Sequence, residues 1–332
     1  MDTKKKKERN IFDFVYADRV LTSVAPSEEP DFKVKNADCE FGVEITEFYF
    51  SHSLARIRNI PGYAMEILEE GKYRHKDDFT PLAVKEFTVE PGDNRRPSFK
   101  VQGFMQERPK INDYVNKVSA VIEHKNTRFA IYVTGLNQVN LIIFDCEHCL
   151  LGTPKNKFHP LFFQPQLETA LIHTSFREVY FVTQLGEFDS PKKVYIPLKM
   201  VFLVAEMFLF NHIMTEEYTD ALLTYAEKLG LLCAEYLLWR GAKDISFKDG
   251  SDGYEVVYGN AGIFIAKDNS VTIRDYSDLA LPVDFTLVST QGVSSFFNDA
   301  FLKTFETYKH GTVFSSELCF DVGGDNQPTL QK

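Results

Sequence analysis

Residues 30–48, PDFKVKNADCEFGVEITEF, decide the fold of this chain. Two runs within the stretch, 30–34 and 41–48, have the alternating apolar pattern of β-strands, and the polar segment 35–38 between them predicts a turn. Alternation along the second strand places Glu44 on the face opposite its apolar neighbours. Glu44 is therefore a carboxylate inside an apolar strand, where a buried charge needs a partner.

Asp31 lies at the start of the first of these strands and could meet Glu44 across the strand pair. Two carboxylates that converge at a strand edge provide the oxygen ligands that hard divalent cations prefer. In the alternative interpretation, Asp31 is a cap or turn residue and Glu44 pairs with a lysine at an edge strand. The sequence leaves both interpretations open.

The composition is that of an ordinary globular protein with apolar material for about two domains. The chain has 332 residues, of which 44% are hydrophobic and 25% charged. Its 30 Phe and 15 Tyr residues favour a structure that contains β-sheet. A net charge of −10 argues against a protein that coats nucleic acid with its whole surface, but it leaves room for a local basic channel.

Several sequence features predict a cytoplasmic protein that does not enter a membrane. Residues 1–7, MDTKKKK, lack the apolar core of a signal peptide. The longest apolar run, residues 199–210, is interrupted by Glu206 and is too short to span a bilayer. The five cysteines are odd in number and scattered, which is typical of a reducing compartment. Cys146 and Cys149 match half of a zinc site, but no second pair has matching spacing, so two cysteines at a strand end is the better interpretation.

Periodicity predicts an α/β (α+β) protein in which helices alternate with strands. The helices are expected at 4–24, 63–68, 110–132, 201–215, 216–240 and 293–308. Further strands are expected at 80–89, 98–106, 139–144, 176–182, 194–198, 254–258, 263–266 and 271–274. A change in character near residue 200 predicts a first domain at 1–200, a helical and β-rich C-terminal domain at 201–322 and a flexible tail at 323–332.

The order of these elements resembles the PD-(D/E)xK, or restriction-endonuclease-like, nuclease superfamily. Pro30-Asp31 matches the PD element, and the stretch GVEIT at 42–46 matches the acidic strand that follows it. The helix that carries Lys125 and the apolar strand after it match the second core helix and the strand behind it. The resemblance covers about residues 4–200 and implies a mixed sheet flanked by helices.

The resemblance also implies a metal site. Asp31 and Glu44 would hold Mg²⁺ or Mn²⁺, with the backbone carbonyl of Ile45 as a third oxygen ligand. Glu8, on the first helix, matches a further acidic residue that some members of the superfamily use. The implied activity is metal-dependent hydrolysis of phosphodiester bonds, because such an ion stabilises the developing charge and lowers the pKa of water.

The chain departs from the family pattern at one position. The motif requires Glu-x-Lys, but Thr46 stands where the lysine is expected. Some members carry that lysine on the second core helix, and Lys125 is the residue at the corresponding place here. The predicted catalytic set is therefore Asp31, Glu44 and Lys125. Without such a lysine, the domain would be a catalytically inactive scaffold or sensor.

The resemblance further implies partners. The expected substrate is nucleic acid, DNA rather than RNA, in a bacterial restriction or antiphage defence context. A second copy of the chain or a defence-system protein is the expected protein partner, and the C-terminal part would select the substrate or mediate assembly. No phosphate-binding loop, nucleophile elbow or zincin motif is present in the sequence, so other hydrolase chemistries lack support.

Overall fold

The structure is a computed structural model. It describes residues 3–36, 39–89, 98–104, 110–136, 138–148, 150–152, 164–186, 191–217, 229–243, 245–268, 270–276, 286–287, 301, 303–305 and 307. The chain divides into two compact units, residues 49–114 and a larger unit formed by residues 1–48 with 115–332. The domain boundary expected near residue 200 falls inside the larger unit, and the expected tail at 323–332 lies outside the described residues.

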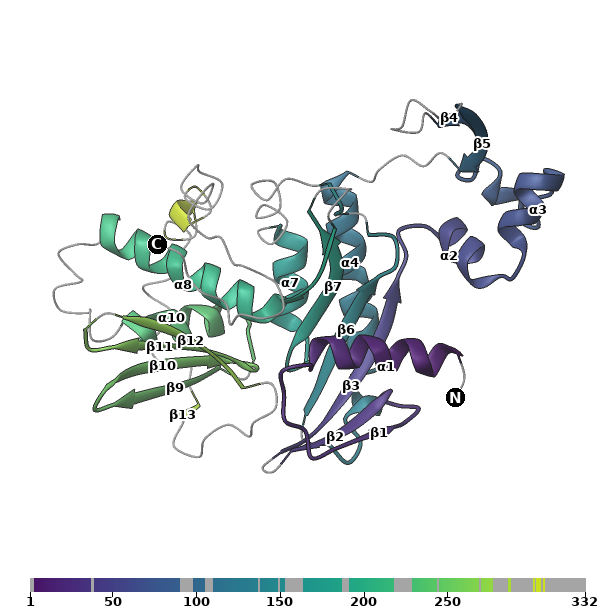
Figure 1. The fold of residues 1–332 in the computed structure, drawn as a ribbon. Helices are drawn as coiled ribbons and strands as arrows, with labels where there is room; N and C mark the ends of the chain where they lie inside the picture. Colours follow the sequence, from purple (N-terminus) through teal and green to yellow (C-terminus); the bar gives the residue numbers. More distant parts are fainter. Residues whose placement is uncertain are drawn as a thin grey trace. The chain divides into compact units, whose positions relative to one another are not determined.

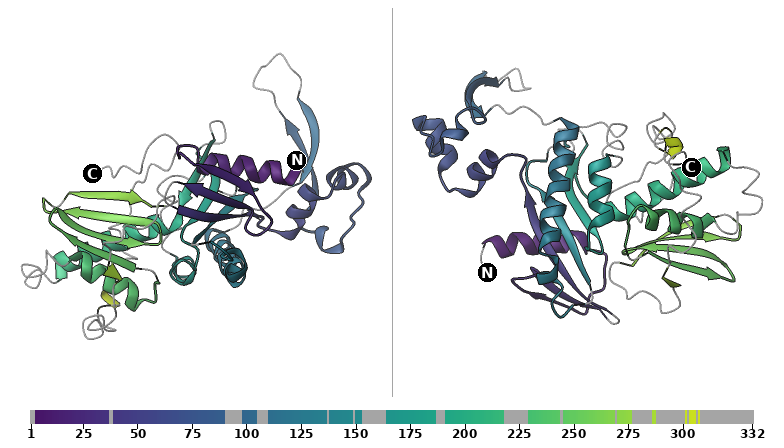
Figure 2. Two further views of the ribbon diagram at one scale, coloured as in Figure 1. Left: turned by 90° about the horizontal axis from the view of Figure 1, so that it is seen from below. Right: turned by 180° about the vertical axis from the view of Figure 1, so that it is seen from behind.

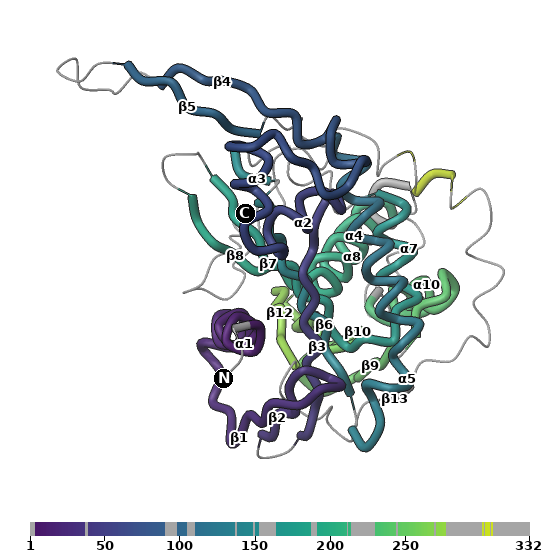
Figure 3. Tube along the Cα trace, turned by 90° about the vertical axis from the view of Figure 1, so that its right-hand side faces the viewer, coloured from purple at the N-terminus to yellow at the C-terminus, as the bar shows by residue number. Residues whose placement is uncertain are grey.

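A six-stranded mixed sheet forms the centre of the larger unit (Figure 1). Its order is β1 (Ser23–Pro26), β2 (Phe32–Asn36), β3 (Cys39–Phe48), β6 (Gln138–Asp145), β7 (Val179–Leu185) and β8 (Lys192–Pro197). The strands β3, β6 and β7 are parallel, and the outer pairs are antiparallel. One face is covered by α1 (Thr3–Val15), and the other by α4 (Ile111–Thr127) and α7 (Pro165–His173) (Figure 3). The prediction of an α/β protein with a mixed sheet flanked by helices is confirmed.

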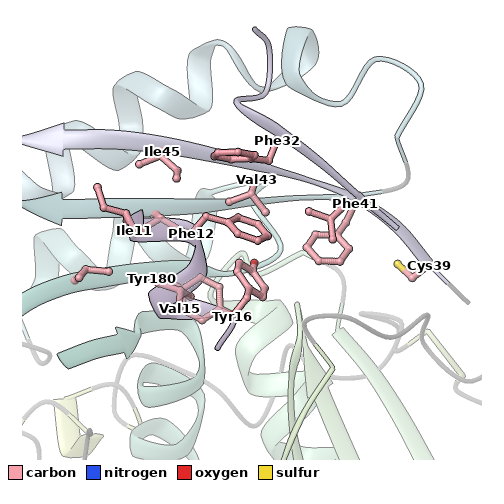
Figure 4. Packing of buried hydrophobic residues seen from close by; sticks show 13 residues of the cluster. Ile11, Phe12, Val15, Tyr16, Phe32, Cys39, Phe41, Val43, Ile45 and Tyr180 are labelled. Atoms are coloured by element: carbon pink, nitrogen blue, oxygen red, sulfur yellow. The ribbon is translucent and has the colours of Figure 1, made fainter. Parts of the chain in front are cut away.

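An apolar stripe attaches α1 to the sheet. Phe12 and Tyr16 stack on each other and pack against aromatic side chains of β2 and β3, within a cluster that also contains Val43 and Ile45 (Figure 4). Successive strand residues point to opposite faces. Because Val43 and Ile45 face α1, Glu44 between them faces the layer of α4.

The first helix is shorter than the sequence pattern predicts. It was expected at 4–24, but it ends at Val15, and residues 23–26 form the edge strand β1. Val20, which the helical pattern places on the apolar face, is 88% exposed. Backbone pairing of β1 with β2, from Ser23 opposite Lys35 to Pro26 opposite Phe32, outweighs the local helical periodicity. Pro26 is tolerated because β1 is at the sheet edge.

The helix expected at 110–132 is interrupted at Arg128. It is observed as α4 and a short separate helix, α5 (Phe129–Tyr132). The run at 139–144, apolar except for Asn140, is a buried strand, β6, as expected for a strand covered on both faces. The strands expected at 176–182 and 194–198 are present as β7 and β8, with bounds shifted by one to three residues.

The unit at residues 49–114 has its own small core. It contains α2 (His52–Asn59), α3 (Tyr63–Glu70), a 3₁₀ turn η1 (Lys76–Asp78) and the antiparallel pair β4 (Val84–Val89) and β5 (Phe99–Phe104). Tyr63, Ile67 and Leu82 are buried together. The fully buried Asp78 accepts hydrogen bonds from Tyr63 and Arg56, so its charge has partners inside this unit.

A second sheet lies in the C-terminal part of the larger unit (Figure 2). It is antiparallel, in the order β12 (Val271–Asp275), β11 (Ala261–Ala266), β10 (Gly253–Tyr258), β9 (Ile245–Gly250) and β13 (Thr286–Leu287). It contacts α8 (Leu198–Glu217) and α10 (Leu229–Trp239). Most of the helix expected at 293–308 lies outside the described residues, although 301, 303–305 and 307 are helical.

The apolar helix α8 carries one buried charge. Glu206 is 1% exposed, and its carboxylate accepts a 3.1 Å hydrogen bond from Arg240, which also binds Glu168 of α7. The ion pair explains how a carboxylate is accommodated within an apolar helix. Within the part of the chain that the structure describes, no helix is long and apolar enough to cross a membrane.

A buried polar network connects α1 to the sheet interior. Asn140 of β6 donates to the hydroxyl of Tyr16 at 2.9 Å, and its carbonyl accepts from the backbone amide of Glu178 at 3.1 Å. The side chain of Glu178 is fully buried and accepts from the amides of Val179 and Lys199, each at 2.8 Å. Burial raises the pKa of Glu178 to about 8, although these hydrogen bonds and the Lys199 charge act in the opposite direction.

This raised pKa predicts a pH dependence of stability. Folding favours the protonated form of Glu178. The stabilising contribution of this group to the free energy of unfolding is therefore complete below the ordinary pKa of 4.5 and is lost as pH rises through about 8. Each unit of pKa difference corresponds to about 1.4 kcal/mol. We expect Glu178→Gln, which is neutral throughout, to flatten the fall in unfolding free energy between about pH 5 and 8, measured by urea denaturation. Equal pH slopes for the two proteins would contradict this prediction.

Candidate functional site

The candidate site begins where the pairing of β2 with β3 ends. The last paired residues are Phe32 and Val43, so the backbone amide of Ile45 has no strand partner on that side. The side chain of Asp31 replaces the missing strand, and its Oδ2 accepts a 2.9 Å hydrogen bond from the Ile45 N–H. This bond fixes one carboxylate oxygen of Asp31 in the plane of the sheet and leaves Oδ1 for other contacts.

A glycine allows Asp31 to lie this close to β3. A Cβ atom at Gly42 would be 2.6 Å from Cγ of Pro30 and 2.9 Å from Cδ1 of Leu136, closer than real Cβ contacts. The proline ring therefore packs directly on the backbone of β3. The Pro30-Asp31 dipeptide and Gly42 belong to one packing arrangement, although they lie on different strands.

Lys125 of α4 reaches the carboxylate of Glu44 on β3. The distance from Nζ to Oε1 is 2.7 Å, and the two side chains are 16% and 8% exposed. Burial is the largest effect on Glu44 and raises its pKa; the hydrogen bond from Lys125 acts to lower the pKa, and the nearby charge of Asp31 raises it again. The net shift is upward, so Lys125 offsets only part of the cost of burying this charge.

Glu8 and Asp31 share a second ammonium, that of Lys5. Lys5 Nζ lies 3.2 Å from Oδ1 of Asp31 and 3.3 Å from Oε2 of Glu8, and it donates to the carbonyl of Ser27 at 2.9 Å. Burial, the largest effect, acts to lower the pKa of Lys5, but the two carboxylates outweigh it and the pKa is raised. Lys4 also pairs with Glu8, at 3.4 Å.

Tyr132 completes the surroundings of Glu44. Burial and the charge of Glu44 raise the pKa of the Tyr132 hydroxyl to about 12. The hydroxyl is buried and interacts with the Glu44 carboxylate. The Lys125 ammonium lies 5.9 Å from the centre of its ring. A second proton donor therefore lies beside the Glu44 carboxylate, in addition to Lys125.

The structure brings the expected site residues together in two groups. Lys125 meets Glu44, and Glu8 meets Asp31 through Lys5. The backbone contact between Ile45 and Asp31 is made by the Ile45 amide nitrogen, whereas the expected role concerned the Ile45 carbonyl.

Sequence reasoning missed Lys5 and Tyr132. Lys5 could have been found because it lies three residues before Glu8, on the same helix face. Tyr132 lies two predicted helical turns after Lys125, but the break at Arg128 makes that spacing uninformative.

The donor chemistry of the site fits a hard divalent cation. Glu8, Asp31 and Glu44 are each 5–6% exposed and supply only oxygen donors. Glu8 Oε2 is a buried oxygen whose ion-pair partner, the Lys5 ammonium, lies 3.3 Å away. Among the described residues, no three acidic, His or Cys side chains already converge on one position. Cys146 is buried and Cys149 lies outside the described residues, so the half zinc site is not tested.

Comparisons with known proteins add no family to this geometry. No protein-family model, no curated protein and no solved structure matches the chain. The resemblance to the PD-(D/E)xK superfamily therefore still rests on the residues quoted above, and function has to be argued from the site itself.

The Glu44–Lys125 pair predicts a coupled effect on stability. Lys125→Met leaves a buried carboxylate without its ammonium, and we expect a loss of about 2–4 kcal/mol. Glu44→Gln should cost less, because Lys125 can extend toward water. The double variant should be destabilised by at least about 1 kcal/mol less than the sum of the single variants, measured by urea unfolding at pH 7.

An exposed charge on α4 provides the control for this cycle. Glu123→Gln should change the unfolding free energy by no more than about 0.5 kcal/mol. Strict additivity of the Glu44 and Lys125 variants would show that the 2.7 Å contact contributes nothing to folding.

Proposed function

We propose that the chain is a metal-dependent nuclease with a PD-(D/E)xK-type site that acts on DNA rather than RNA. One observation carries the proposal: Lys125, 81 residues after Glu44, donates a 2.7 Å hydrogen bond to it. The family motif expects a lysine two residues after the acidic residue, where Thr46 stands. An ammonium from α4 supplies the missing positive charge at the same carboxylate.

The order of elements supports a restriction-endonuclease-like core. In chain order, α1 carries Glu8, Asp31 immediately precedes β2, β3 carries Glu44, and α4 carries Lys125. The strands β1, β2 and β3 are antiparallel neighbours. The next strand, β6, is parallel to β3. This order of elements supports the assignment of Glu8, Asp31, Glu44 and Lys125 to one site.

Each residue has a role that follows from its contacts. Asp31 and Glu44 would hold Mg²⁺ or Mn²⁺, with the Ile45 carbonyl and Glu8 as further oxygen donors. The bound ion would stabilise negative charge on the phosphate and lower the pKa of water. The Ile45 amide holds Asp31 in one orientation, so the carboxylate need not be ordered when substrate binds.

Lys125 would serve both Glu44 and the substrate. An ammonium has three donor protons, and Glu44 takes one of them. The others can donate to a phosphate oxygen or orient the attacking water, where they act on charge that develops in the transition state. The Tyr132 hydroxyl is a further donor beside Glu44.

A second function, that of a catalytically inactive scaffold or sensor, is favoured by a specific observation. Each of the three buried carboxylates already has a lysine partner, so the cluster is balanced in charge without a metal. Ion pairs of this kind occur as purely structural elements. Metal binding distinguishes the two functions, because a scaffold has no need of it.

The nuclease proposal predicts that the purified protein degrades DNA with Mg²⁺ or Mn²⁺. Asp31→Asn and Glu44→Gln keep the side-chain shape but remove the charge, and Lys125→Met removes the ammonium. We expect each to lower the cleavage rate at least about a hundredfold. Glu47→Gln, on the opposite face of β3 and paired with Lys7, is the matched control and should retain activity.

Calorimetric titration with Mn²⁺ completes this test. The wild-type protein should bind the ion, and Asp31→Asn should weaken binding. Cleavage by Glu44→Gln at the wild-type rate would overturn the site assignment. A folded wild-type protein that neither binds Mn²⁺ nor cleaves DNA or RNA would support the scaffold.

The proposed role of Lys125 can be tested by moving the lysine. Thr46 is half-buried and, by strand alternation, lies on the same face of β3 as Glu44. If the ammonium acts through its charge at this carboxylate, adding Thr46→Lys to Lys125→Met should recover at least about tenfold in cleavage rate over Lys125→Met alone. Recovery of stability without recovery of cleavage would limit Lys125 to a structural role.

A further inference from the structure

One ammonium of the chain itself is surrounded by oxygens from three separate segments. Within 3.3 Å of Lys5 Nζ lie Oε2 of Glu8, the backbone carbonyl of Ser27 and Oδ1 of Asp31. These are two carboxylates and a carbonyl, the oxygen types that Mg²⁺ and Ca²⁺ sites use. Lys5 thus occupies a position enclosed by cation ligands.

The Glu8 carboxylate is held only loosely by its lysine partners. Glu8 is 5% exposed, its Oε2 lies 3.3 Å from the Lys5 ammonium, and its Oε1 lies 3.4 Å from that of Lys4. Charge-assisted hydrogen bonds are ordinarily about 2.7–2.9 Å long. A divalent cation would bind the same oxygens at a shorter distance.

We propose that Lys5 is an internal counter-ion that blocks the divalent-cation site and must withdraw before the metal binds. This inference rests on the proposed function and adds a regulatory step to the same site. The ammonium and a divalent cation repel each other and require the same oxygens of Glu8 and Asp31. Metal binding is therefore an exchange of one cation for another.

The position of Lys5 in α1 makes withdrawal feasible. The helix begins at Thr3, and its first turn contains only basic charges, which the helix dipole disfavours at an N-terminus. Contacts with Glu8, Ser27 and Asp31 hold this turn in place. When a metal takes the carboxylates, the first turn loses those contacts and becomes free to fray.

The test compares Mn²⁺ affinity in three full-length proteins by calorimetry. Lys5→Met keeps the aliphatic stem but removes the charge, and we expect it to bind Mn²⁺ at least about tenfold more tightly than wild type. Lys6→Met is the matched control, because Lys6 is exposed and makes no ion pair among the described residues; its affinity should equal that of wild type. Adding Asp31→Asn to Lys5→Met should abolish the gain.

Hydrogen exchange provides a second measurement that needs no variant. Mn²⁺ should increase amide exchange at residues 7–9 of the wild-type protein, where helical hydrogen bonds of α1 begin. Wild-type binding that is not tightened in Lys5→Met, or an unchanged or slower exchange, would overturn the inference and leave the proposed function intact. Absence of Mn²⁺ binding in both proteins would overturn both.

Discussion

The burial of three carboxylates is the constraint on which the rest of the structure depends. Glu8, Asp31 and Glu44 are each at most 6% exposed, and a lone buried carboxylate is far too costly to persist. Lys5 and Lys125 supply the compensating charges from opposite sides of the sheet. The two helices that carry these lysines, α1 and α4, are thereby fixed in register as well as in packing.

The sheet creates the site by ending a strand pairing early. Beyond Phe32 and Val43, β3 continues without β2, and the Asp31 side chain takes over the hydrogen bonding. The close approach requires Gly42, where any Cβ would collide with Pro30. The candidate site residues therefore lie at an irregularity in an otherwise regular sheet, where the backbone orients one oxygen of the Asp31 carboxylate and leaves the other for further contacts.

The successes and errors of sequence reasoning have physical causes. The strands β3 and β6 were predictable because alternation and a largely apolar run report burial directly. The length of the first helix was not predictable. Residues 23–26 satisfy their backbone hydrogen bonds by pairing with β2, and no local sequence pattern contains that contact. The exposed Val20 shows the same limit, since an apolar residue in helical spacing need not be in a helix.

By itself, the sequence determined which residues could form the site: the carboxylates Asp31 and Glu44 on neighbouring strands, and Lys125 as the candidate for the charge that Thr46 lacks. Only the tertiary structure decided that Lys125 meets Glu44 across 81 residues and that Lys5 meets Asp31 across 26. The reason is that each of these pairs forms where packing brings the two side chains into contact and excludes most water from them. That exclusion arises from α1 and α4 covering opposite faces of β3, and not from any local run of residues.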